Sequence, residues 1–355
     1  MSALSIYAGA DALQHIQKYG LTKDDVGVML GASGGPKWLV LASLDRYLMG
    51  KWFADRKEPL HLLGTSAGAW RLSCYAQNDP IAALARLEEA YLSQQYPDKA
   101  TRAEISQVIE SILDHTLGET GGQEIVNNPI MRYHNIVTRC KGLGAFENGV
   151  LQATSMLGAF LGNLATPGAM RPFVERVLFH HPELPPVVSF PDFPARKVVL
   201  TEKNIKQAIL ASGSIPIVFS GVKNIPGAPM GMYRDGGITD YQFNLPVMPK
   251  NGIVLYPHYS ATPPKAVWFD KKLKRRVATK EHYKRTVIIA PSHEFVATLP
   301  GGKIPDRQEV FDFPEYSVRR KRWDTVMKEC ERLADEFAEI DQKQSWAELA
   351  QPLPW

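Results

Sequence analysis

A serine stands between two glycines in the stretch Gly64-Thr65-Ser66-Ala67-Gly68, which has G-x-S-x-G spacing. In a nucleophile elbow, this spacing exposes a serine on a sharp turn between a strand and a helix, and small neighbours let the flanking backbones approach closely. The N-terminus of the following helix also stabilises negative charge as it develops. The motif indicates a nucleophilic Ser66, and an ordinary tight turn is the alternative.

A second glycine turn lies in the sequence GASGGPKW at 31–38, just before a predicted helix. A phosphate-binding loop of the form G-x-x-x-x-G-K-[ST] needs glycine at Pro36 and serine or threonine at Trp38, which argues against that loop. Pro36 instead suits the first position of a helix. Free N–H groups of Gly34 and Gly35 would stabilise an oxyanion, an effect worth about 3 kcal/mol per donor. The alternative is a turn that only connects strand to helix.

The proton acceptor for Ser66 is either a late histidine or a carboxylate. Three late histidines lie in no recognisable motif: His258, His282 and His293. Asp235 follows a predicted strand and precedes Gly236 and Gly237, which leave room around its side chain. A carboxylate within hydrogen-bond reach of a hydroxyl can act as a general base when burial raises its pKa. Asp235 is therefore the preferred candidate, and a plain D-G-G turn is the alternative.

Taken in order, the three turns resemble the signatures of the patatin-like phospholipase family, which are a glycine-rich oxyanion loop, G-x-S-x-G and D-G-[GA]. Two further stretches are similar to that family. The sequence AILASGSIPIVF at 208–219 resembles its A-x-x-A-S-x-x-x-P-x-x-F block, and NLP at 244–246 resembles its N-x-P stretch. The resemblance covers the chain from about Val26 to Pro246.

The resemblance implies a Ser–Asp dyad without a catalytic histidine, in a three-layer α/β/α domain with a mostly parallel central sheet. Ser66 would attack an ester carbonyl, and Asp235 would accept its proton. The amides of Gly34 and Gly35 would form the oxyanion hole. The supporting residues are Lys37, Gly64, Gly68, Gly236 and Gly237. The implied substrates are phospholipids or other acyl esters, and neither a metal nor a cofactor is expected.

The oxyanion loop departs from the family pattern at two positions. Ser33 stands where the family often has the first glycine, and this costs backbone freedom. Trp38 stands where a further glycine is usual, and its ring would narrow the site or form an apolar wall. Both changes leave the dyad intact, and they leave substrates other than phospholipid open. Lys37 matches the basic position of the loop, where it would fix the loop or add positive potential.

The elements that position these residues follow from the spacing of apolar side chains. Strands are predicted at 26–30 and 61–63, and each leads through a glycine turn into a helix, at 38–49 and at 67–76. Further strands are predicted at 132–138, 196–201, 232–234, 252–256 and 286–290, and further helices at 11–18, 80–114 and 205–212. Strands that alternate with helices in this way predict an α/β sheet.

The 355 residues, 45% of them hydrophobic, are enough for one large core. No internal repeat or low-complexity linker divides the chain. The simplest partition is an acyl hydrolase domain over 1–310, with core motifs at 26–246, and a C-terminal segment over 311–355. That segment contains a long amphipathic helix predicted at 318–341, which we expect to pack on the same domain.

Composition limits the partners and the compartment. The net charge is +4, from 41 basic and 37 acidic residues. This balance gives no support to a nucleic-acid-binding protein, which would show a concentrated basic face. The three cysteines are scattered and form no C-x-x-C pair, which fits a reducing compartment. Residues 1–20 lack the pattern of a secretory signal. We therefore expect a cytoplasmic protein and leave peripheral membrane contact open.

Two segments bear on that membrane contact. Residues 149–170 carry no charge over about the length that spans a bilayer, but they include Gln152, Asn163 and Pro167. A buried or site-lining helix is therefore preferred over a span. The basic run KKLKRR at 271–276 is interpreted as a solvated loop, and a patch that meets anionic headgroups is the alternative.

The leading hypothesis is a serine acyl hydrolase of lipid esters, similar to a phospholipase A, that works through an acyl-enzyme. The same dyad also allows acyl transfer or thioester hydrolysis. An inactive scaffold that binds a membrane or a partner belongs to another class of function. The intact Ser66 and Asp235 favour an enzyme, because a scaffold needs neither.

Overall fold

The computed structural model describes residues 2–97, 99–183, 188–249 and 252–355. Its strands form one sheet with the order β11-β1-β10-β9-β2-β3-β4-β5-β6, and β8 pairs with β4 and β7 outside this path. The strands are β1 (Leu4–Ala8), β2 (Val26–Gly31), β3 (Leu60–Thr65), β4 (Met131–Cys140), β5 (Val174–His180), β6 (Ala195–Val199), β7 (Val222–Lys223), β8 (Met232–Arg234), β9 (Ile253–Pro257), β10 (Thr286–Pro291) and β11 (Gln351–Pro352).

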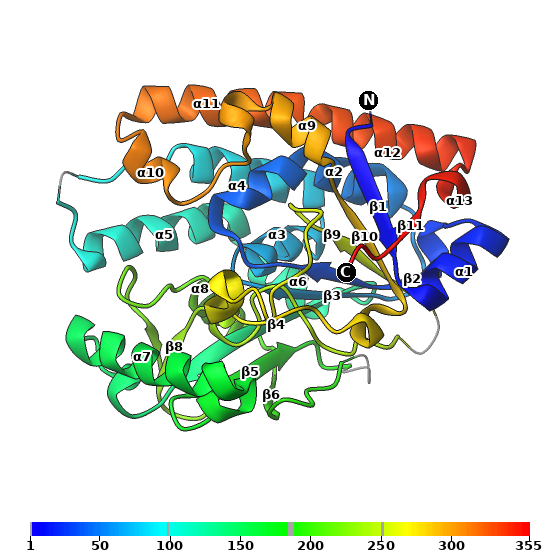
Figure 1. Cartoon of the computed structure of the whole chain (residues 1–355). Coiled ribbons are helices and arrows are strands. Elements are labelled where there is room, and N and C mark those ends of the chain that lie inside the picture. The colour runs from blue at the N-terminus through cyan, green and yellow to red at the C-terminus, as the bar shows by residue number, and fades with distance from the viewer. Residues whose placement is uncertain (1, 98, 184–187, 250–251) are drawn as a thin grey trace.

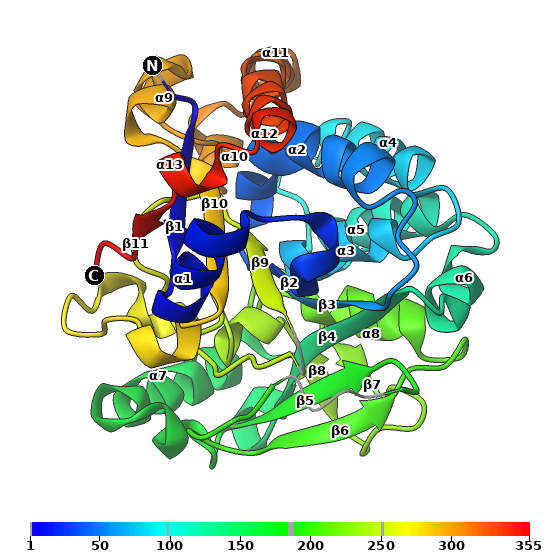
Figure 2. The same cartoon turned by 90° about the vertical axis from the view of Figure 1, so that its right-hand side faces the viewer.

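Helices flank this sheet. The helices are α1 (Ala10–Tyr19), α2 (Ala42–Tyr47), α3 (Ala67–Tyr75), α4 (Pro80–Leu92), α5 (Arg102–Leu117), α6 (Gly121–Asn127), α7 (Gly149–Ala165), α8 (Ile205–Ser212), α9 (His293–Thr298), α10 (Glu309–Asp312), α11 (Tyr316–Glu329), α12 (Glu331–Lys343) and α13 (Trp346–Leu349). Figure 1 shows α2 to α5 above the central strands with α11 and α12 above them, while α7 lies below. A view from the side shows the twist of the sheet between these groups (Figure 2).

The centre of the sheet is parallel, as the α/β pattern predicts. Strands β10, β9, β2, β3 and β4 run in the same direction, and β5 turns back antiparallel to β4. All six residues of β3 and of β10 are buried, which is typical of a parallel strand covered on both faces. Gly31 pairs with Gly64 at the carboxyl ends of β2 and β3. The turns that follow these two strands therefore begin side by side.

The segment 38–49 was predicted as one regular α-helix, and this prediction is wrong. A 3₁₀ turn (Gly35–Leu41) leads into the short α2, and a π turn (Leu48–Trp52) follows. Residues 38–42 are all buried, because the segment lies between α3 and the C-terminal helices. Apolar residues on every side give no single helical face, so packing rather than a 3.6-residue period sets the local geometry.

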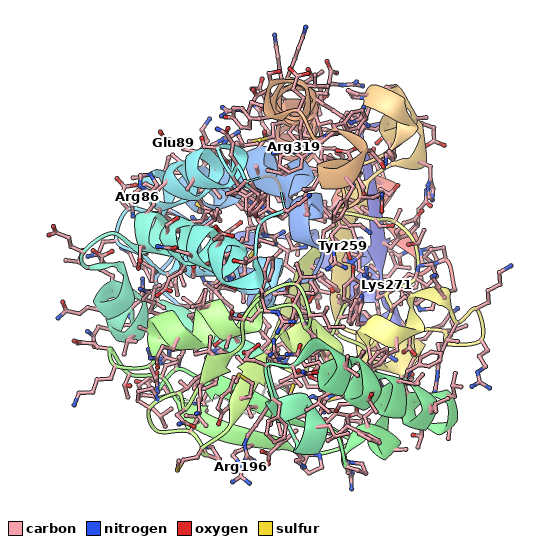
Figure 3. The ribbon with its side chains drawn as sticks, turned by 90° about the vertical axis from the view of Figure 1, so that its left-hand side faces the viewer. Arg86, Glu89, Arg196, Tyr259, Lys271 and Arg319 are labelled. Carbon is pink, nitrogen blue, oxygen red and sulfur yellow. The ribbon has the colours of Figure 1, made fainter. Side chains whose placement is uncertain are left out.

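The predicted helix over 318–341 is two helices. Cys330 lies between α11 and α12 with ψ −5°, which interrupts the regular ladder. Helix α11 contacts the 3₁₀ turn of the oxyanion loop, and α12 contacts α2. The Arg319 guanidinium of α11 donates to the Gln94 carbonyl beyond α4 at 3.2 Å. Figure 3 labels Arg319 on this helix. Residues 351–352 also pair with β1, although the domain boundary at 310 stays a prediction.

The remaining predicted strands agree with the structure to within a few residues, and so do α1, α3 and α8. The helical pattern predicted over 80–114 is wrong as one helix: α4 ends at Leu92, and α5 begins at Arg102 after a capping box at Thr101. The elements that were not expected are β1, β5, β7, β11, α6, α9, α10 and α13. Strand β5 has the sequence VERVLFH, and its last five residues are all buried. Because both faces of the strand are covered there, the sequence lacks the alternation of apolar and polar residues that marks a half-exposed strand. The uncharged segment at 149–170 forms α7 and a following turn. Within the described residues, none of the helices is both long and apolar enough to cross a membrane.

Candidate active site

Ser66 lies at the sharp turn between β3 and α3, where it is the N-cap residue of the helix. Its φ of 51° and ψ of −127° are rare for a residue with a side chain, and such strain costs about 1–3 kcal/mol. The Ser66 N–H donates to the Ser212 hydroxyl at 2.9 Å, and that hydroxyl donates to the Ile136 carbonyl at 2.7 Å. Long-range contacts therefore hold the strained turn.

Asp235 follows β8 and brings its carboxylate to Ser66. The Ser66 hydroxyl donates to Asp235 Oδ2 at 2.8 Å, and the Gly237 N–H donates to Oδ1 at 2.7 Å. Burial raises the pKa of Asp235 to about 6, although the hydrogen bonds from Gly237 and Ser66 oppose the shift. A carboxylate with this pKa is ionised at neutral pH and is a better proton acceptor than an exposed one.

The oxyanion loop follows β2 and presents two amides. Neither the Gly34 N–H nor the Gly35 N–H donates to an acceptor in the part of the chain that the structure describes. Gly35 has a φ of 56°, a left-handed conformation that glycine adopts without strain. The Tyr259 hydroxyl donates to the Ser33 carbonyl at 2.9 Å, and the Ser33 N–H donates to the Tyr241 carbonyl at 2.9 Å. The loop is thus held while its amides stay available.

The supporting glycines lie where other atoms approach their backbone. A Cβ at Gly68 would lie 2.0 Å from the Gly31 carbonyl oxygen, and one at Gly64 would lie 2.5 Å from Ala69 Cα. A Cβ at Gly236 would lie 2.1 Å from the Ile136 carbonyl oxygen. Side chains at these positions would push the two strand ends apart.

The two departures from the family pattern have different outcomes. Ser33 does not adopt a positive φ, so the serine causes no left-handed strain. Its hydroxyl occupies the space beside Gly237, where a Cβ would approach it to 2.5 Å. Trp38 is buried and packs edge to face on Tyr91, with 5.4 Å between the ring centroids. The expected apolar wall is therefore wrong, because Trp38 does not line the cavity.

Ser66 and Asp235 line a cavity of about 300 Å³ together with Gly34 and Gly35. Three cationic side chains also line it: Lys37, Lys271 and Arg307. The sequence patterns singled out Lys37, and they included Lys271 only as part of a basic run. Arg307 precedes α10 and carries no sequence signal. Its place in the cavity follows only from the folding of the segment before α10 over the oxyanion loop.

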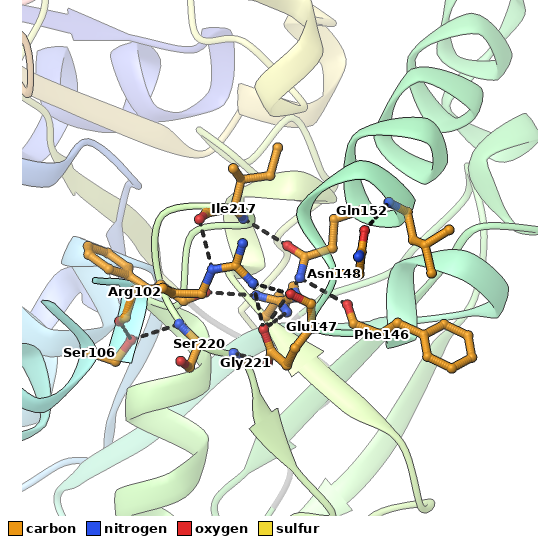
Figure 4. A network of polar contacts seen from close by, with 12 residues as sticks. Arg102, Ser106, Phe146, Glu147, Asn148, Gln152, Ile217, Ser220 and Gly221 are labelled. Carbon is orange, nitrogen blue, oxygen red and sulfur yellow. Dashed lines mark hydrogen bonds and ion pairs between the residues drawn. The ribbon is translucent and has the colours of Figure 1, made fainter. Parts of the chain in front are cut away.

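The segment 215–221 forms another wall of the cavity through Ile215 and Pro216. Figure 4 shows how neighbouring helices hold it. The Arg102 guanidinium donates to the Ile217 carbonyl at 3.0 Å, and the Gln152 side chain of α7 accepts from the Ile217 N–H at 2.8 Å. Glu147 bridges Arg102 at 3.1 Å and the buried Arg234 at 2.9 Å. The network therefore connects this wall to the strand that carries Asp235.

The late histidines do not contact Ser66, and none of them lines the cavity. Burial lowers the pKa of His258 to about 4, and its Nδ1 pairs with the Ser260 carbonyl. His282 contacts Asn244, and His293 begins α9. Among the described residues, no group of three or more His, Cys, Asp or Glu side chains is arranged to hold a metal ion.

A family model described as Patatin-like phospholipase matches residues 40–249, more than half of the chain. The chain belongs to the patatin-like phospholipase family. Ser66 and Asp235 lie inside the matched range, whereas Gly34, Gly35 and Lys37 lie before it.

Solved structures with low sequence identity are also similar to this chain. Human GIVD cytosolic phospholipase A2 has a TM-score of 0.42 and 10% identity, over 96% of this chain and 65% of that chain. VipD from Legionella pneumophila has a TM-score of 0.35 and 11% identity, over 93% of this chain and 70% of that chain. The ExoU–SpcU complex of the Pseudomonas aeruginosa type III secretion system has a TM-score of 0.31 and 16% identity, over 90% of this chain and 52% of that chain. No curated protein sequence matches.

Proposed function

We propose that the protein is a serine acyl hydrolase of lipid esters that uses a Ser66–Asp235 dyad. One observation carries this proposal. The hydroxyl of a strained serine donates to a buried carboxylate at 2.8 Å, in a cavity that two unbonded glycine amides also line. A nucleophile, a base and an oxyanion site in one cavity are the parts that acyl transfer to a serine needs.

In the first half-reaction, Ser66 Oγ attacks the ester carbonyl carbon, and its proton moves to Asp235 Oδ2. The carbonyl oxygen becomes an oxyanion that accepts hydrogen bonds from the Gly34 and Gly35 amides. The tetrahedral intermediate then collapses, and the bond to the alcohol breaks. Asp235 returns the proton to the leaving alkoxide, which departs as an alcohol and leaves an acyl-enzyme.

In the second half-reaction, a water molecule replaces the alcohol in the cavity. Asp235 accepts a proton from this water as its oxygen attacks the acyl carbon. The same two amides stabilise the second oxyanion. Collapse releases the carboxylic acid, and the proton on Asp235 returns to Ser66 Oγ. An alcohol or lysolipid that replaced water here would give acyl transfer instead of hydrolysis.

We also propose that the enzyme meets lipid through an exposed apolar surface on α7. The side chains of Val150, Leu157 and Leu161 are 73%, 57% and 55% exposed, and their spacing places them on one face of the helix. Arg275 and Arg276 of the basic run donate to the carbonyls of Leu164 and Asn163 near the end of this helix. Cations beside an apolar helix face suit an anionic lipid surface.

The proposed function is tested by labelling and turnover. We expect an active-site fluorophosphonate to label the wild type at Ser66, and Ser66→Ala to lose both labelling and hydrolysis of 4-nitrophenyl esters. Ser111→Ala, on the exposed face of α5, is the control and should behave as the wild type. Full esterase activity in Ser66→Ala, or no turnover of any acyl ester by the wild type, contradicts the proposal. Added alcohol acceptors reveal acyl transfer as a new ester product.

A further inference from the structure

Three cations face the cavity of Ser66, and the proposed chemistry uses none of them directly. Lys37 comes from the oxyanion loop, Lys271 from the segment after β9, and Arg307 from the segment before α10. Lys271 and Arg307 lie beyond residues 40–249, which the family model matches. A Cβ at Gly35 would lie 3.1 Å from Arg307 Cγ, so the aliphatic part of this arginine covers the oxyanion loop.

None of these three charged groups has an ion pair within 4.0 Å or donates a hydrogen bond among the described residues. Aromatic rings hold them instead. Lys37 Nζ is 4.9 Å from the Tyr259 ring centroid, and Lys271 Nζ is 4.1 Å from that of Tyr241. The Arg307 guanidinium carbon is 5.9 Å from the centroid of the Trp268 ring. Tyr259 and Lys271 are labelled in Figure 3. Aromatic faces attract a cation but carry no net charge, so the positive charge remains unneutralised.

The carboxylates of the cavity wall do not balance these cations. Asp235 already accepts hydrogen bonds from Ser66 and Gly237, and Asp306 lies 3.9 Å from Lys303. Burial lowers the pKa of Lys37, and Asp306 opposes this shift. Burial lowers the pKa of Lys271 to about 7, and the charges of Arg307 and Lys37 add to the shift. Lys271 as a whole residue is exposed, whereas its ammonium group is partly desolvated and lies over the Tyr241 ring.

We propose that Lys271 and Arg307, with Lys37, form an anion subsite beside Ser66, and that the substrate is an ester with a phosphate or carboxylate group near the scissile bond. This inference rests on the proposed function. A bound anion would replace the mutual repulsion of the three cations with charge-assisted hydrogen bonds. A volume of about 300 Å³ is at the small end of ligand pockets, so it suits the ester and a compact charged group.

The test compares pairs of soluble esters that differ only in the anion. One pair is 4-nitrophenyl heptanoate and mono-4-nitrophenyl pimelate, and the other is monohexanoylglycerol and its glycerol phosphate analogue. We expect the wild type to favour the anionic member of at least one pair. Lys271→Met and Arg307→Met should each lower the anionic-to-neutral ratio of kcat/KM by about 10- to 100-fold, as expected for a lost hydrogen bond to a charged group. The pair that responds identifies carboxylate or phosphate.

Lys203→Met, an exposed change of the same charge before α8, is the control and should keep the wild-type ratio. A wild type without preference in either pair overturns the subsite, and so does an unchanged ratio in both variants. These results leave the proposed function standing if turnover still requires Ser66. The absence of turnover with all four esters, together with no labelling of Ser66, contradicts the proposed function itself. Thermal melting of both variants confirms that they fold.

Discussion

At Asp235, the burial that destabilises the carboxylate is also what would make it a general base. Its carboxylate is removed from water by the strand ends and the two glycine turns around it. Burial raises its pKa to about 6, above the usual value near 3.8 of an exposed aspartate. Above pH 6 the folded protein therefore carries an ionised group that the unfolded chain would solvate better. A general base near neutral pH requires this cost.

The Asp235→Asn variant should be inactive and more stable than the wild type at pH 7. The folded state binds the extra proton between about pH 4 and pH 6, so the ionisation penalty is present above this window and absent below it. The shift of about two pKa units corresponds to at most about 3 kcal/mol. The asparagine can still accept from Gly237 and donate to Ser66. Urea unfolding at pH 7 and at pH 4 measures the gain, which should vanish at pH 4.

Wild-type kcat/KM for a neutral ester should also fall as the pH decreases through about 6, because Asp235 must be ionised to accept the serine proton. An Asp235→Asn variant that is less stable than the wild type at pH 7 would show that the carboxylate supports the fold through its hydrogen bonds.

Among the contacts between elements, a buried ion pair connects α2 and α3, the helix that follows the Ser66 turn. Arg71 Nε of α3 lies 3.1 Å from Asp45 Oδ2 of α2, and both side chains are buried. The Tyr75 hydroxyl donates to Asp45 Oδ1 at 2.7 Å. Ser66 is the N-cap residue of α3, so the position of α3 relative to α2 sets where the Ser66 turn lies. This pair is a structural requirement of the site rather than a part of its chemistry.

Asp45→Ala should lower the free energy of unfolding by about 3–5 kcal/mol, because it leaves the Arg71 charge buried without a partner. Asp324→Ala removes one partner of the exposed pair with Arg320 at 2.8 Å and should cost less than about 1 kcal/mol. Urea unfolding of both variants measures the difference. A similar small loss in both would mean that water reaches Arg71 in the variant.

At the scale of the whole molecule, α7 presents its apolar face outward while its other face packs on the protein. Met156 and Ala159 are buried in a small cluster with Ile238 and Val267. Ile238 also lines the cavity that contains Ser66, so α7 supports this cavity without lining it. Figure 1 shows α7 at the periphery, away from α11 and α12. This position suits a helix that contacts a lipid surface near the cavity.

The double variant Leu157→Asp/Leu161→Asp should lose binding to vesicles of phosphatidylcholine with phosphatidylserine, because charges replace the two exposed leucines. Val318→Asp changes a 46% exposed side chain on α11 and should bind as the wild type does. Co-sedimentation at low and high salt measures binding, and the basic run should make it weaker at high salt. Equal binding of the double variant and the control would place the contact elsewhere.

Sequence patterns were most reliable where a local rule determines the structure. Glycines at 34–35, at 64 and 68, and at 236–237 mark tight turns after buried strands, and the structure has a turn at each place. Predictions that needed knowledge of the surroundings were wrong. Trp38 was expected to narrow the site or form an apolar wall of it, but its ring packs on Tyr91 of α4. One regular helix was expected over 38–49. Because the segment is buried on all sides, it forms a 3₁₀ turn, the short helix α2 and a π turn instead.

By itself, the sequence determined the α/β pattern and the family and singled out Ser66 and Asp235 as the candidate dyad, because each depends on a short motif and its order in the chain. Only the tertiary structure decided that the two side chains share a hydrogen bond of 2.8 Å and that burial raises the pKa of the aspartate. It also brought Lys271 and Arg307 to the same cavity. Distance and desolvation are set by the packing of segments far apart in the chain, which no local spacing records.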